Sequence, residues 1–146
     1  MNRKSKLDIA TELLDRALRL YYDGDSYFAA LHLAGASEEI LAVYLKRQGG
    51  ISAFDGLKDL TVWLSMRSDN RSKEKIESDI FNLMNHAKNS TKHMYGKNDC
   101  IVDFNAESEA HDILDRAVSN CYQLMFSLDL KETELTRRFT TEMTQA

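Results

Sequence analysis

The chain contains no proline in 146 residues. Average usage of about 5% would supply roughly seven. Proline concentrates in turns, edge strands and stiff linkers, so its absence argues against a turn-rich sandwich or barrel. The six glycines are also few and point the same way. A helical protein tolerates this composition best, because a helix accepts proline only in its first turn. The sequence therefore predicts an all-α fold.

The length suits one domain with its own core, so we expect residues 1–146 to form a single helical domain. Hydrophobic residues make up 43% and charged residues 29%, which excludes a disordered or membrane-embedded chain. No apolar signal-peptide core follows the N-terminus. The most apolar stretch, residues 27–45, carries Glu38 and Glu39 in its middle, and a bilayer core would penalise both. We expect a core helix there and no membrane contact.

Apolar residues at spacings of three and four predict an up-down bundle of five or six helices. Ser5 and Asn105 are expected N-caps, Asp25 or Ser26 caps the second helix, and Gly24 ends the first. The second helix is rich in alanine and is the expected centre of the bundle. The expected ranges are about 6–23, 26–48, 57–67, 72–87, 105–128 and 133–143.

Two helices in the middle of the chain are expected to bury apolar faces. In the third helix, which Asp55 would begin, the expected inward residues are Leu57, Leu60, Trp63 and Leu64. In the fourth they are Ile76, Ile80, Leu83, Met84 and Ala87. The periodicity then fails over residues 88–99, and residues 100–104 are expected to be briefly extended. We expect any chemistry in this irregular stretch.

The formal net charge of −4 hides an asymmetry. Residues 66–97 hold seven basic and four acidic side chains, whereas residues 98–146 hold four and ten. The basic excess is either a solvated face or the footprint of a nucleic acid. The two cysteines, Cys100 and Cys121, have no metal or redox spacing, and this indicates free thiols in a reducing cytoplasm.

No glycine-rich phosphate loop, nucleophile elbow or zinc-protease motif is present. Among the four histidines, His32 is interpreted as a core imidazole hydrogen-bonded to a neighbour. His111 shares a helical face with Glu107 and Asp115, but the chain has no Glu-x-x-His pair of the kind that helical metal sites use. We therefore expect no metal and no cofactor.

His86 and His93 lie in a polar cluster at the end of the fourth helix. Its other members are Asn85, Lys88, Asn89 and Lys92. Such residues either solvate a fraying helix end or line a site in which lysine and imidazole meet a phosphate or carboxylate. A histidine exchanges protons near neutral pH, and an ammonium stabilises charge on a phosphorane, so such a site needs no metal.

These features resemble the HEPN (higher eukaryotes and prokaryotes nucleotide-binding) domains, which are helical domains of bacterial toxin and defence systems. Residues 12–50 have the rhythm of their opening hairpin, and residues 88–93 resemble their Arg-Asn-x-x-x-His signature with Lys88 in place of arginine. The resemblance implies a metal-independent ribonuclease in which His93 is acid or base, Lys88 stabilises charge and Asn89 orients the substrate. Lysine lacks the bidentate fork of arginine, so weakened or lost activity is expected.

We thus expect a cytoplasmic, HEPN-like protein that binds RNA or a nucleotide, or cleaves RNA, with Lys92, His86 and Asn85 as further binding residues. The resemblance also implies a homodimer, because HEPN sites are composite. The alternative is a non-catalytic helical interaction module for a protein or small molecule.

Overall fold

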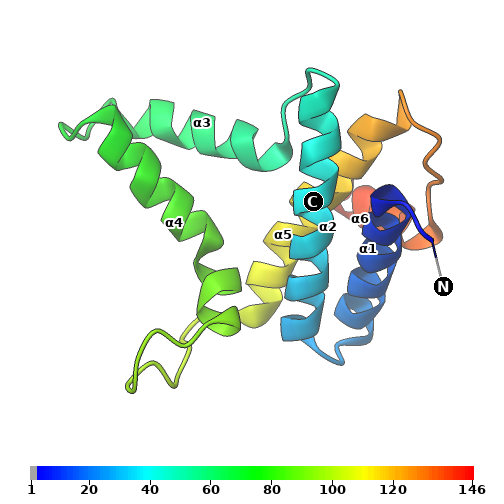
Figure 1. Cartoon of the computed structure of the whole chain (residues 1–146), viewed down its shortest axis with the longest axis horizontal. Coiled ribbons are helices and arrows are strands. Elements are labelled where there is room, and N and C mark those ends of the chain that lie inside the picture. The colour runs from blue at the N-terminus through cyan, green and yellow to red at the C-terminus, as the bar shows by residue number, and fades with distance from the viewer. Residues whose placement is uncertain (1–2) are drawn as a thin grey trace.

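The computed structural model describes residues 3–146, and within this range the chain forms six α-helices and no strand. The predicted all-α helical bundle is confirmed (Figure 1). Each helix begins after a residue whose side chain accepts a hydrogen bond from a backbone N–H of the first turn. The helices are α1 (Lys6–Asp23), α2 (Tyr27–Arg47), α3 (Ala53–Ser65), α4 (Lys73–Lys92), α5 (Ala106–Met125) and α6 (Glu134–Gln145).

The core lies where α1, α2 and α5 pack against one another. Alanines at the contacts let the three helices approach closely, as Ala17, Ala34 and Ala117 are fully buried. The α6 helix closes one side and inserts the buried ring of Phe139. As predicted, α2 is the central helix, because it packs on both α1 and α5.

The length and composition of α2 alone would allow it to cross a membrane, and no other helix in residues 3–146 meets this test. Much of α2 is instead buried within the bundle. Its Glu38 accepts a hydrogen bond at 2.7 Å from Nε of Arg116 on α5, and both side chains are buried. The packing is that of the core helix of a bundle.

The α3 and α4 helices form a hairpin that projects from the bundle (Figure 1). Val62 and Ile76 are buried in this hairpin. The expected inward orientation of Leu57, Leu60, Trp63 and Leu64 is wrong, since these side chains are between 47% and 56% exposed, and Leu83 is 75% exposed. Periodicity finds an apolar face, but it does not reveal whether another element covers that face.

Two boundaries differ from the sequence prediction by four residues or more. The third helix begins at Ala53, because Ser52 caps it and Asp55 lies in its first turn. The fourth helix continues to Lys92, so residues 88–92 are helical and the irregular segment spans residues 93–105. The residues after Ala87 are polar, so the apolar periodicity does not extend over this last turn. The side chain of Lys88 lies across Gly35 of α2, where an added Cβ would lie 2.6 Å from Cδ of Lys88.

Candidate functional site

The last turn of α4 and the irregular segment lie near the N-terminal half of α2 (Figure 1). A cavity of about 560 Å³ opens between them. We call it the α2–α4 cavity. It draws residues from two parts of the chain that are distant in sequence, the N-terminal half of α2 and residues 90–102. They are Phe28, Ala29 and His32 of α2, Ser90–Lys92 of α4 with its C-cap His93, and Met94, Asp99, Cys100, Ile101 and Val102 of the irregular segment.

His93 and Lys92, two residues of the polar cluster, both line this cavity. His93 is the C-cap of α4, and its backbone N–H donates to the carbonyl oxygen of Asn89 at 3.1 Å. Its exposed ring lies against the ring of Tyr95, with the centroids 5.7 Å apart. In the described chain no ion pair involves Lys92, so its ammonium is available to an anion.

Lys88 is separated from this pair. Its side chain is buried, and its Nζ donates to Oε1 of Glu39 at 2.7 Å. It lines a second cavity of about 330 Å³ between α2, α3 and α4. Within one protomer the structure therefore does not bring Lys88 and His93 to one cavity, and the charge of Lys88 is already paired.

The other predicted residues surround the end of α4. Asn89 is exposed on the helix surface. Asn85 lines the second cavity and donates from Nδ2 to the carbonyl oxygen of Phe81 at 2.9 Å. His86 is exposed, and its ring meets the edge of Phe104, with the centroids 6.3 Å apart. None of the three lines the α2–α4 cavity.

His32 is the residue that sequence reasoning missed. Its expected hydrogen bond exists, since Nε2 lies 2.8 Å from Oγ1 of Thr91, but the ring also lines the cavity beside His93. His32 and Thr91 are 59 positions apart in the sequence, so no local spacing pattern could have indicated this contact. Only the crossing of α4 over α2 brings the two helices together.

The hydroxyl of Thr91 lies 2.7 Å from the carbonyl oxygen of Ala87 and 2.8 Å from Nε2 of His32. Where the hydroxyl donates its one proton to Ala87, it accepts from Nε2–H of His32, and Nδ1 then carries the lone pair. Burial lowers the pKa of His32, and the positive charges of Lys92 and Lys88 lower it further. The lowered pKa favours the neutral imidazole, which can accept a proton.

The cavity thus combines a neutral imidazole, a second imidazole and an unpaired ammonium. Residues 3–146 contain no group of three or more His, Cys, Asp or Glu side chains arranged to hold a metal ion. Cys100, at the rim, is an unpaired exposed thiol whose Sγ donates to the carbonyl oxygen of Lys97 at 3.2 Å. These groups are suited to binding an anion and to moving protons.

Comparisons with protein-family models, curated proteins and solved structures found no match for this chain.

Proposed function

We propose that the α2–α4 cavity binds single-stranded RNA and cleaves it slowly without a metal, as in an HEPN-like protein of a toxin or defence system. The observation that carries the proposal is that His32, Lys92 and His93 line one open cavity. Two imidazoles supply a base and an acid, and the ammonium attracts the phosphate. A further support is the basic excess of residues 66–97, to which Lys92 belongs.

The chemistry is a transesterification. Nδ1 of His32 accepts the proton of the ribose 2′-hydroxyl while that oxygen attacks phosphorus. The bond from phosphorus to the 5′-oxygen breaks, and His93 gives that oxygen a proton. The products are a 2′,3′-cyclic phosphate and a free 5′-hydroxyl, and Lys92 balances the charge on the phosphorane.

The test is cleavage of a labelled single-stranded RNA in the presence of EDTA. Wild-type protein should produce cyclic phosphate ends, and His32→Ala and His93→Ala should each lower the rate at least tenfold. His86→Ala is the matched control, because His86 is exposed on the same helix but outside the cavity, and it should cleave at the wild-type rate. Equal rates for His93→Ala and wild type would refute the proposal.

A second candidate is RNA binding without turnover. The pairing of Lys88 with Glu39 favours it, because the cation at the arginine position of the motif is occupied. This candidate predicts RNA binding that weakens steeply with salt and no cleavage products. No binding even at low salt would leave the role of a protein or small-molecule interaction module.

A further inference from the structure

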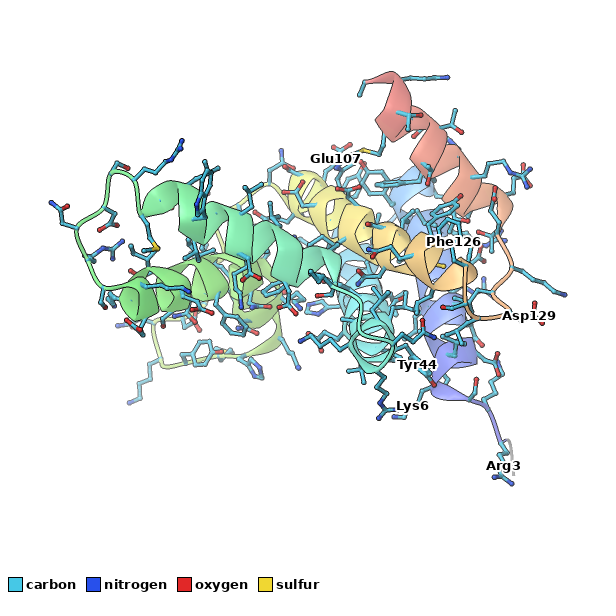
Figure 2. All side chains as sticks on the ribbon, turned by 90° about the horizontal axis from the view of Figure 1, so that it is seen from above. Arg3, Lys6, Tyr44, Glu107, Phe126 and Asp129 are labelled. Atoms are coloured by element: carbon cyan, nitrogen blue, oxygen red, sulfur yellow. The ribbon has the colours of Figure 1, made fainter. Side chains whose placement is uncertain are left out.

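One face of α3 carries large apolar side chains that the described chain leaves about half exposed. Leu57, Leu60 and Leu64 follow one another at intervals of three and four residues, so they form a stripe along the helix. They lie on the side opposite to Val62, the buried residue of α3, and each is about half exposed. In the view from above, no other helix passes over α3 (Figure 2). We call these three residues the α3 leucine stripe.

Exposed apolar neighbours widen the stripe into a patch. Trp63 lies beside it at 56% exposure and carries the Arg67 guanidinium 4.4 Å from its ring centroid. Ile51 is 65% exposed and lies close to Gly56, where an added Cβ would be 3.8 Å from its Cγ2. Contiguous apolar patches of this kind mark interaction surfaces.

The total surface of the chain is large for a monomer of its mass. The protein exposes 9657 Å². A folded monomer of this mass is expected to expose about 7,600 Å². The excess of roughly 2,000 Å² is more than twice the area of about 800 Å² that each partner buries in a standard interface. The irregular segment contributes to this excess surface. The projecting hairpin contributes as well, and its exposed surface includes the apolar side chains of α3.

The register of the leucine stripe fits a second copy of itself. A two-fold axis through the middle of the stripe, beside Leu60, runs two α3 helices antiparallel. It places Leu57 of one protomer against Leu64 of the partner subunit, and the two Leu60 side chains meet near the axis. This is the reciprocal pattern of an isologous contact. Two helical hairpins joined in this way also complete a four-helix arrangement that one hairpin cannot form.

We infer that the α3 leucine stripe is the contact surface for a second copy of this chain, in a symmetric dimer joined through the projecting hairpins. This interface is independent of the proposed RNA site, and it differs from a dimer that would assemble a composite site from Lys88 and His93.

The test is the solution mass, measured by sedimentation or light scattering. Wild-type protein should show twice the chain mass of 16.7 kDa, and Leu60→Lys should show the chain mass. Leu83→Lys is the matched control, because Leu83 is an equally apolar and more exposed residue on α4 outside the stripe, and it should remain dimeric. Circular dichroism should show the same helix content in all three proteins. A wild-type monomer at micromolar concentration, or a dimer that survives Leu60→Lys, would overturn the inference.

A cross-link tests the two-fold axis without weakening the interface. In a Cys100→Ser background, Leu60→Cys should form an intermolecular disulfide under mild oxidation, while Leu83→Cys should not. Equal cross-linking of the two variants, or none from Leu60→Cys, would contradict the proposed register.

Discussion

Glu38 and Arg116 form a buried ion pair that joins α2 to α5. Glu38 is 2% exposed and Arg116 is 8% exposed. One hydrogen bond joins them, and among the described residues neither Oε2 of Glu38 nor Nη2 of Arg116 has a further hydrogen-bond partner. Because both charges are buried, each needs the other as its partner, since an unpaired charge in a core costs free energy.

We predict that Glu38→Ala destabilises the protein by about 3–5 kcal/mol, because it leaves Arg116 buried without a partner. Urea unfolding gives the free energy. Glu12→Ala, which removes an exposed partner of Lys4 on α1, is the control and should leave the unfolding midpoint unchanged. A Glu38→Ala protein as stable as wild type would mean that the pair does not hold the two helices together.

The second residue-scale prediction concerns pH. The pKa of His32 is lowered from its usual 6.5 by burial and by Lys92 and Lys88. The unfolded chain therefore binds a proton more readily than the folded one, and stability present above about pH 6.5 is lost as the pH falls toward the folded pKa. Urea unfolding at pH 7.5 and pH 5 should show this loss, and His32→Gln should reduce it. An identical pH dependence in the variant would remove His32 as the cause.

At the scale of helices, the crossing of α4 over α2 builds the α2–α4 cavity. Gly35 permits the crossing because the side chain of Lys88 occupies the space that a Cβ would need. Thr91, one turn further along α4, then reaches His32. The crossing thus places residues of the Lys88–His93 motif beside α2.

We predict that Gly35→Val displaces α4 and destabilises the protein by about 1–3 kcal/mol, as expected for overpacking. Gly96→Val is the matched control, because nothing lies within 4 Å of a Cβ added there. The control should unfold at the wild-type midpoint. If Gly35→Val unfolds like the control, the crossing is not tightly packed.

The sequence predicts the structural features that depend on neighbouring residues, and it does not predict those that depend on how the helices pack. Capping residues such as Ser5 and Asn105 act locally, so the sequence located the helices that they begin. The orientation of Leu60 and the role of His32 depend on which helices cross, and no short-range pattern records that. Lys88 was recognised as a possible site residue, but its pairing with Glu39 arises only from the packing of α4 on α2.

In the whole molecule, salt bridges neutralise part of the basic excess of residues 66–97. Arg71 and Lys75 pair with Asp79, and Lys88 pairs with Glu39. In residues 3–146 no salt bridge involves Lys92 or Lys97, near the cavity. The positive charge that salt bridges leave unpaired thus includes the end of α4 and the irregular segment after it.

We predict that RNA affinity falls linearly with salt on a double-logarithmic plot, and that Lys92→Ala with Lys97→Ala lowers the slope by about 0.7 for each phosphate contact removed. Filter binding at several salt concentrations measures it. Lys73→Ala with Lys75→Ala, at the opposite end of α4, should keep the wild-type slope. If both pairs change the slope equally, the RNA does not bind preferentially near the cavity.

The central claim, that RNA binds in the cavity that His32 and His93 both line, is tested most directly by NMR of the histidine Cε1–H signals. The ligand is a short RNA with 2′-O-methyl groups, which cannot be cleaved. The signals of His32 and His93 should shift together and saturate at the same RNA concentration, while those of His86 and His111 stay in place. Unmoved signals for His32 and His93, or a larger shift at His86, would contradict the account.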